Sequence, residues 1–221
     1  MFEKQSGKTV IKVCHVTKRL GGTEVLRDVN FSCREGKICG IIGHNGSGKT
    51  VLFKCISGLY RPEEGEIYVR KKRLEEEMPQ GMGIIIDSPA FLPGKSGMQN
   101  LELLYLLNHR RDRSHLEEIM RKVGLDPVSR KHVKYYSLGM RQRLAIAQAI
   151  MEDPDILILD EPMNGLDRNG IREIRELLLE WKARGKTILL ASHNREDIEL
   201  LCDEVYEMEM GRLEPEKVSQ A

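Results

Sequence analysis

The segment GHNGSGKT, residues 43–50, is the strongest constraint on the fold of this 221-residue chain. It fits the pattern G-x-x-x-x-G-K-[ST] and directly follows the apolar stretch ICGII. Glycines at these places let the backbone curl so that its N–H groups face a phosphate chain, and the helix that follows adds the positive end of its dipole. Lys49 is expected to reach the β- and γ-phosphates, and the Thr50 hydroxyl to ligate Mg²⁺. The predicted phosphate-binding residues are Gly43, His44, Asn45, Gly46, Ser47, Gly48, Lys49 and Thr50.

A second chemical signal is ILILDEP, residues 156–162. A buried strand that ends at Asp160 and Glu161 places two carboxylates at the carboxyl edge of a sheet, where ligands bind in open α/β folds. We expect Asp160 to hold Mg²⁺ through water and Glu161 to polarise an attacking water. The alternative is that these residues only end a strand and begin a turn.

Hydrophobic patterning predicts an α/β fold. Runs rich in β-branched residues predict short strands at 10–16, 25–31, 37–42 and 66–69. In the last third, two buried runs at 156–159 and 187–192 flank a helical apolar face, and strand, helix and strand at this spacing imply a parallel sheet with crossover helices.

The middle third of the chain is predicted to be helical. Ser114 to Glu117 fits a capping box, an apolar helical face follows, and Gly124 is expected to stop that helix. Further on, YSLGMRQR at 136–143 precedes a helical run, and Ser137 is a favoured N-cap. The segment is either a capped helix and nothing more, or a phosphate receptor built from a helix N-terminus, a hydroxyl and the flexible Gly139.

Charge and hydropathy exclude several classes of protein. The 35 basic and 34 acidic residues leave a net charge of +1, which gives no electrostatic case for a nucleic-acid partner. The longest apolar runs fall far short of the roughly 18 residues that cross a bilayer, and the N-terminus lacks the apolar stretch of a signal peptide. We therefore expect a soluble, cytoplasmic chain. The cysteines form no CxxC pair and are predicted to be reduced and packed: Cys14, Cys33, Cys39, Cys55 and Cys202.

Taken in order, GHNGSGKT, YSLGMRQR, ILILDEP, NGLD and SHN resemble the nucleotide-binding subunit of an ATP-binding cassette (ABC) transporter. The resemblance runs from about Ile11 to Leu213. It implies a P-loop NTPase (RecA-like) core with a mainly parallel sheet, an N-terminal antiparallel β lobe and an inserted helical lobe. The implied single domain spans 1–221, with a core lobe at 1–86 and 152–213, a helical lobe at 88–151 and a polar tail at 214–221.

The resemblance also implies an ATPase that uses ATP and Mg²⁺. In this family two subunits sandwich two ATP molecules head to tail, so Ser137 and Gly139 are implied to face the phosphate loop of the second subunit. Asn164-Gly165-Leu166-Asp167 resembles the D-loop, with Asp167 at the dimer seam. His193 resembles the switch histidine that contacts the γ-phosphate and holds the water and Glu161 in line.

Three positions depart from the family pattern. Where the usual signature reads LSGGQ, this chain has Leu138 in place of a glycine and Met140 in place of the glutamine. Asp87 occupies the place of the Q-loop glutamine; it is predicted to be a metal-side residue, with a turn-forming aspartate as the alternative. Leu20 stands where an aromatic side chain usually stacks on adenine, which predicts weak discrimination between ATP and GTP.

The acidic residue at 87, YSLGMRQRL and EPMNGLD together resemble the ATPase subunits of bacitracin-type and lantibiotic-type peptide exporters. That implies a separate integral membrane permease docked near residues 88–107, a second ATPase subunit in a homodimer, and a peripheral place on the cytoplasmic face of the cell membrane. Other possibilities are a soluble ABC-type ATPase acting on ribosomes or DNA, a P-loop kinase or GTPase, and a weakly active regulatory cassette of a heterodimer.

Overall fold

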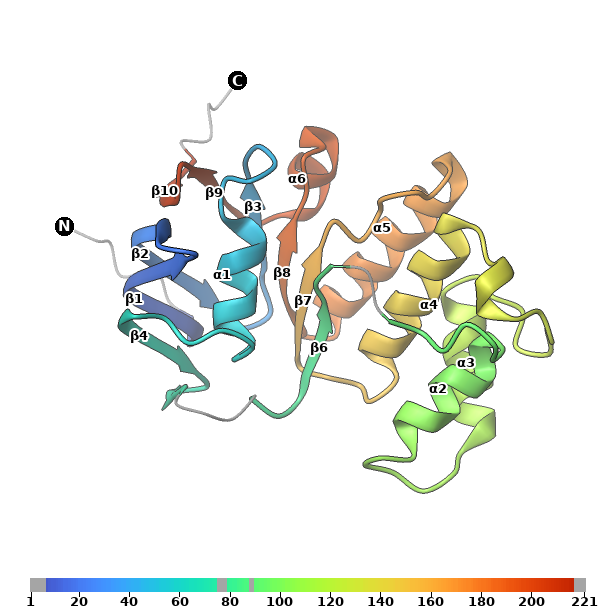
Figure 1. The fold of residues 1–221 in the computed structure, drawn as a ribbon. Helices are drawn as coiled ribbons and strands as arrows, with labels where there is room; N and C mark the ends of the chain where they lie inside the picture. Colours follow the sequence, from blue (N-terminus) through green and yellow to red (C-terminus); the bar gives the residue numbers. More distant parts are fainter. Residues whose placement is uncertain (1–6, 75–78, 88–89, 217–221) are drawn as a thin grey trace.

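The computed structural model describes residues 7–74, 79–87 and 90–216, which form two sheets flanked by helices (Figure 1). The central sheet has the order β10-β9-β3-β8-β7-β6, and its pairings are parallel except for β9 with β10. The predicted parallel sheet is thereby confirmed. Its strands are β3 (Ile38–Ile42), β6 (Met82–Ile85), β7 (Ile156–Asp160), β8 (Thr187–Ala191), β9 (Glu204–Glu209) and β10 (Arg212–Pro215).

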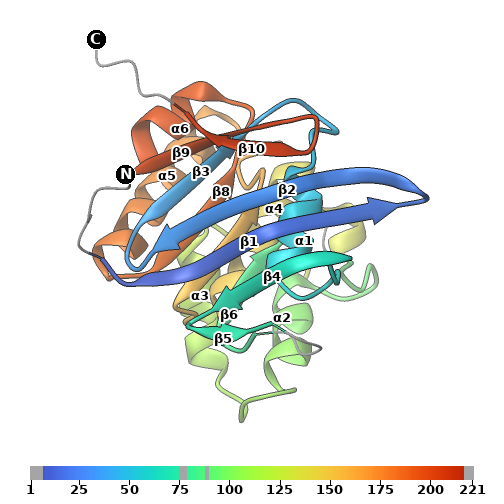
Figure 2. The same cartoon turned by 90° about the vertical axis from the view of Figure 1, so that its left-hand side faces the viewer.

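A second, antiparallel sheet has the order β2-β1-β4-β5 and lies toward the viewer in Figure 2. Its two long strands exceed the predicted runs because register shifts let the pairing continue up to a turn at Gly21 and Gly22, both with positive φ. The strands are β1 (Thr9–Leu20), β2 (Thr23–Arg34), β4 (Glu64–Val69) and β5 (Lys72–Arg73).

The helices lie in different places relative to the central sheet. Helix α1 lies between the antiparallel sheet and the central sheet, whereas α2, α3 and α4 gather beyond the opposite side of the central sheet (Figure 1). None of the helices in the described ranges has the length and hydropathy to span a bilayer. The helices are α1 (Lys49–Ile56), α2 (Gly97–Tyr105), α3 (Arg113–Lys122), α4 (Leu138–Ile150), α5 (Arg168–Ala183) and α6 (Arg195–Leu201), with a 3₁₀ turn at Val133–Tyr135.

Strand β7 explains how the core holds the carboxylates in place. Its side chains alternate between two hydrophobic clusters: Ile156 and Ile158 face the cluster around α1, and Leu157 and Leu159 face the cluster under α4 and α5. Each fully buried side chain of this size contributes about 1.5–3 kcal/mol to folding. The register of β7 is therefore fixed from both faces, and Asp160 can only emerge at the carboxyl edge.

Helix caps follow the sequence patterns with one correction. The predicted capping box at Ser114 is wrong, because α3 begins earlier and Asp112 is its N-cap: Asp112 Oδ1 accepts from the His115 N–H at 3.0 Å, and the Ser114 hydroxyl donates to the same oxygen at 2.8 Å. Two other predictions are confirmed: Ser137 caps α4, and Gly124 ends α3 with φ of 73°.

Candidate nucleotide-binding site

The loop at residues 43–50 closes around the ammonium group of Lys49. This side chain is only 6% exposed, and its Nζ donates to the carbonyl oxygens of Gly43 at 2.6 Å and His44 at 3.2 Å. Gly43 has no room for a larger residue, because a Cβ there would lie 2.3 Å from the carbonyl oxygen of Met208. The charge is thus buried inside a backbone loop and hydrogen-bonded to backbone carbonyl groups, which suits it to an anionic ligand.

The start of α1 offers further polar groups to such a ligand. The helix has no side-chain cap and no acidic residue in its first turn, and its N-cap, Gly48, has φ of 119°. Ser47 Oγ is buried and has no hydrogen-bond partner among the described residues. An uncapped helix N-terminus beside a buried, unpaired hydroxyl and a buried lysine fits a phosphate chain.

Thr50 and Asp160 meet where the first turn of α1 faces the end of β7. Thr50 Oγ1 donates to Asp160 Oδ2 at 2.5 Å. Burial raises the pKa of Asp160 above its ordinary value, and the hydrogen bond from Thr50 and the charge of Lys49 oppose that rise. A hydroxyl and a carboxylate oxygen in contact are the donors that Mg²⁺ prefers, and a cation would relieve the burial of this carboxylate. These two residues therefore fit Mg²⁺.

Glu161 and His193 form a pair at the same edge of the sheet. Glu161 has φ of 52°, and its backbone N–H donates to the Ala191 carbonyl oxygen at 2.9 Å, which turns the chain as it leaves β7. Glu161 Oε2 lies 2.8 Å from His193 Nδ1, while Oε1 is buried without a partner in the described residues. One oxygen is held by the histidine and the other is left to accept a proton, as a base acting on water requires.

A buried network behind His193 fixes the position of its loop. Ser192 Oγ donates to Asp197 Oδ2 at 3.1 Å and accepts from the Asn194 N–H at 3.1 Å. Arg175 of α5 donates to Asp197 Oδ1 through Nε at 2.8 Å and through Nη2 at 2.5 Å. The residues on both sides of His193 are therefore hydrogen-bonded into one ionic cluster. Periodicity did not reveal this cluster, since it joins two helices and a loop.

Asp87, predicted on the metal side, pairs with a lysine in the structure. Asp87 Oδ2 lies 2.6 Å from Lys54 Nζ, and this hydrogen bond raises the pKa of Lys54. Lys54 lies one helical turn after Thr50, so the Asp87 carboxylate is close enough to contribute to the raised pKa of Asp160. Residue spacing does not indicate this partner, because the pairing depends on the path of the chain after β6.

Ser137, Gly139 and Asp167 lie apart from their own phosphate loop. Ser137 Oγ accepts from the Met140 N–H at 3.2 Å, and Asp167 Oδ1 accepts from the Gly170 N–H at 2.8 Å as the N-cap of α5. None of the three forms a hydrogen bond to residues 43–50 within the described ranges. The structure of one chain thus unites Lys49, Thr50, Asp160, Glu161 and His193, and leaves this second group separate.

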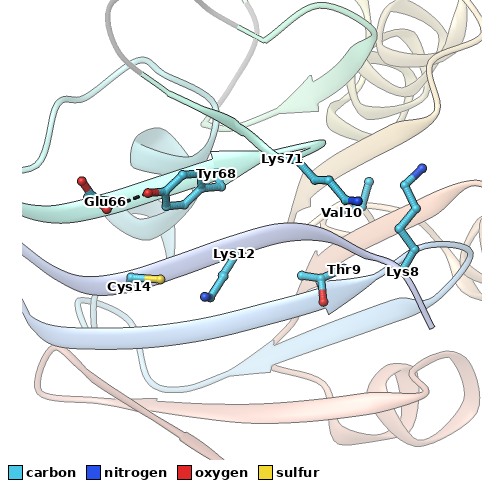
Figure 3. A pocket seen from close by; sticks show the side chains of 8 residues that line it. All are labelled: Lys8, Thr9, Val10, Lys12, Cys14, Glu66, Tyr68 and Lys71. Carbon is cyan, nitrogen blue, oxygen red and sulfur yellow. Dashed lines mark hydrogen bonds between the residues drawn. The ribbon is translucent and has the colours of Figure 1, made fainter. Parts of the chain in front are cut away.

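Leu20 is 37% exposed at the end of β1. A hollow of about 690 Å³ lies elsewhere, over the face of β1 and β4 shown in Figure 3. Three of its eight lining residues are lysines, and it shares no residue with the loop at 43–50. It is lined by Lys8, Thr9, Val10, Lys12, Cys14, Glu66, Tyr68 and Lys71.

A scan against protein families places residues 26–164 in the ABC transporter family. The chain belongs to that family. The match covers more than half of the chain and includes the phosphate loop, the segment 136–143 and the Asp160–Glu161 pair. The prediction of an ATP-binding ABC transporter ATPase is therefore confirmed, and a kinase or GTPase is excluded.

Curated relatives agree over nearly the whole chain. YybJ, an uncharacterized ABC transporter ATP-binding protein of Bacillus subtilis, is 41% identical over 93% of this chain and 95% of its own length. The bacitracin transport ATP-binding protein BcrA of Enterococcus faecalis is 39% identical over 92% of this chain and 68% of its own. The lantibiotic transport ATP-binding protein SrtF of Streptococcus pyogenes is 33% identical, with 94% and 90% covered. The expected resemblance to this subgroup is thereby confirmed.

Solved structures confirm the fold class. A dimeric ATP-binding cassette in a post-hydrolysis state, bound to ADP and Pi, superposes with a TM-score of 0.85 at 24% identity, covering 96% of this chain and all of that one. At this identity the likeness concerns the fold alone. The phosphate loop, the parallel sheet, the antiparallel lobe and the helical lobe together make up an ABC cassette.

Proposed function

We propose that this chain hydrolyses ATP to drive a membrane exporter of amphiphilic peptides, of the kind represented by bacitracin and lantibiotics. The similarity to BcrA and SrtF supports this cargo class. The observation that carries the catalytic part is the Glu161–His193 pair, with one carboxylate oxygen held at 2.8 Å and the other without a partner in the described residues. A regulatory cassette with little activity would not need such a pair.

Each residue of the site has a distinct task in this proposal. Lys49 and the N–H groups of residues 43–50 bind the phosphates, and Thr50 and Asp160 hold Mg²⁺. The bound cation would supply positive charge to the phosphate oxygens as the terminal phosphate is transferred to water. Glu161 orients the attacking water and accepts its proton, while His193 keeps Glu161 in line. Asp87 is proposed to act on the metal side after leaving Lys54.

The site is proposed to become complete only with a second copy of the chain. Ser137, Gly139 and Asp167 form no hydrogen bond with their own phosphate loop, and they are proposed to face that of the second subunit in a head-to-tail homodimer. The hydroxyl of Ser137 and the first N–H groups of α4 would then contact the partner's terminal phosphate. The signature segment, residues 136–143, would thus form part of the nucleotide site of the second subunit.

The permease is proposed to dock near residues 88–107, at the start of a helical lobe that is proposed to span 88–151 beside a core lobe at 1–86 and 152–213. Residues 88 and 89 lie outside the described residues. Four leucines in the remainder are largely exposed and give the surface an apolar character: Leu92, Leu103, Leu106 and Leu107. Because Ser96, Met98 and Asn100 are buried, charges are best introduced at Leu103 and Leu107 to test binding without unfolding α2.

Docking there would place the chain on the cytoplasmic face of the cell membrane, attached through its permease. A tagged Glu161→Gln chain tests this. Glutamine keeps the shape of the side chain but cannot take a proton from water, so ATP should be bound and not turned over. Captured with ATP and Mg²⁺ from detergent-solubilised native membranes, the variant should bring down a polytopic membrane protein. Recovery of ribosomal or other soluble partners instead would overturn the transporter proposal.

A further inference from the structure

Leu138, the residue that replaces a glycine in the signature segment, rests on a glycine of the D-loop in the same chain. A Cβ built on Gly165 would lie 2.4 Å from Leu138 Cγ and 2.5 Å from Leu138 Cδ2. Those distances are far inside van der Waals contact, so the leucine fills the space that any larger residue at 165 would need. The pair is complementary: a large side chain at one position and no side chain at the other.

The same end of α4 contacts the loop that follows β7 at two further points. A Cβ on Gly139 would lie 2.9 Å from the carbonyl oxygen of Gly165, and Gln142 Nε2 donates to the carbonyl oxygen of Glu161 at 3.4 Å. The first turns of α4 therefore lie along the segment from residue 161 to residue 165. Glu161, the proposed base, is at one end of that segment.

This segment has a backbone that needs external support. Glu161 and Gly165 both have positive φ, 52° and 77°, and α5 does not begin until Arg168. A positive φ is strained for a residue with a side chain, such as Glu161, and persists only when its surroundings determine it, whereas a glycine such as Gly165 adopts it freely. Leu138 is 64% exposed, so the side chain touches the loop with one side and leaves the other side open.

We propose that Leu138 is a positioning residue that clamps the segment 161–167 against the start of α4. The inference rests on the two-subunit site proposed above. In that site Ser137 and Gly139 contact nucleotide held by the partner, and Leu138, lying between them in sequence, transmits the position of α4 to Glu161 of its own chain. Nucleotide in one site thereby sets the catalytic geometry of the other.

The clamp predicts a specific split in the kinetics. Leu138→Gly should lower kcat for ATP about tenfold, since Glu161 loses its support. The affinity of the single chain for ATP, measured with Ser137→Asp added to Glu161→Gln so that the chain stays monomeric, should change by less than about twofold, because among the described residues Leu138 forms no hydrogen bond with residues 43–50 of its own chain. Leu138→Met, which keeps the bulk, should retain most of the activity. Leu200→Ala, which trims a similarly exposed leucine on α6, serves as the matched control.

A double-mutant cycle decides whether the contact with Gly165 is the cause. Gly165→Ala alone should reduce kcat about tenfold, since its methyl group collides with Leu138. In the Leu138→Gly background the same substitution should lower kcat no more than about threefold. That remaining loss comes from the strain of an alanine at positive φ. Thermal unfolding of all four proteins checks that each is folded.

The outcomes separate this inference from the function on which it rests. Equal losses from Gly165→Ala in both backgrounds, with an active wild-type chain, would overturn the clamp and leave the ATPase proposal standing. A fall in ATP affinity that matches the fall in kcat would also overturn it. A wild-type chain that does not hydrolyse ATP would instead refute the proposed function itself.

Discussion

The loop that carries His193 is held by Asp197, and removing this carboxylate should destabilise the protein measurably. Asp197 is 3% exposed and accepts hydrogen bonds from Arg175 at 2.5 and 2.8 Å and from Ser192 at 3.1 Å. Breaking a buried ion pair by removing one partner costs about 3–5 kcal/mol. Arg175 keeps a second partner in Glu196, so we expect Asp197→Ala to cost about 3 kcal/mol, the lower end of that range.

Urea unfolding of the nucleotide-free protein measures this cost. With a slope of about 2 kcal/mol per molar, a loss of about 3 kcal/mol lowers the midpoint by about 1.5 M. The matched control is Glu196→Ala, which removes the exposed partner of the same arginine and should shift the midpoint much less, because solvent screens an exposed ion pair. ATPase activity should fall in Asp197→Ala and not in Glu196→Ala, because only Asp197 fixes Ser192 beside His193. A midpoint shift under about 0.5 M, or equal shifts for both variants, would refute the reasoning.

Three further expectations follow from the site. Burial raises the pKa of Asp160, so the ionised carboxylate lowers the stability of the fold at pH values above that raised pKa. This cost disappears when the pH falls below the ordinary pKa of an aspartate. Asp160→Asn should therefore raise the urea midpoint at pH 7, lose that gain on acidification, and abolish ATP hydrolysis. Ser137→Asp keeps an acceptor for the Met140 N–H, so its melting temperature should equal that of the wild type. Its ATPase activity should fall about tenfold or more, because the substitution places a negative charge toward the partner's phosphate. Activity equal to that of the wild type would argue against that placement. With Leu20 in the usual place of a stacking aromatic residue, GTP should displace bound ATP with comparable affinity, and a strong ATP preference in competition binding would contradict this.

The parts of the site that follow parallel strands could be predicted from the sequence. The carboxyl ends of β3, β7 and β8 meet at one edge, so Lys49, Asp160 and His193 had to come together once a parallel sheet was inferred. These residues are far apart in the sequence, from 49 to 193, and the order of the strands in the sheet brings them together. The motif spacing and the buried runs carried that inference without any knowledge of side-chain packing.

The contacts that refine the site could not be predicted in this way. The pairs Lys54–Asp87 and Arg175–Asp197, and the Leu138–Gly165 contact, depend on loop paths and on how two helices pack, which periodicity does not encode. Cap positions illustrate the same limit on a smaller scale. Asp112 and Ser114 both suit an N-cap by composition, and the choice between them depends on where the chain enters α3. The capping box from Ser96 to Gln99 did fit the S-x-x-Q pattern and was missed.

In the proposed mechanism two copies of this chain close on ATP, and each completes the site of the other. The most direct test is the mass of the Glu161→Gln chain in solution, measured by light scattering with and without ATP and Mg²⁺. We expect one chain mass without nucleotide and twice that mass with it, and a return to one chain mass when Ser137→Asp is added. A protein that binds ATP and keeps the mass of a single chain would rule out the two-subunit site.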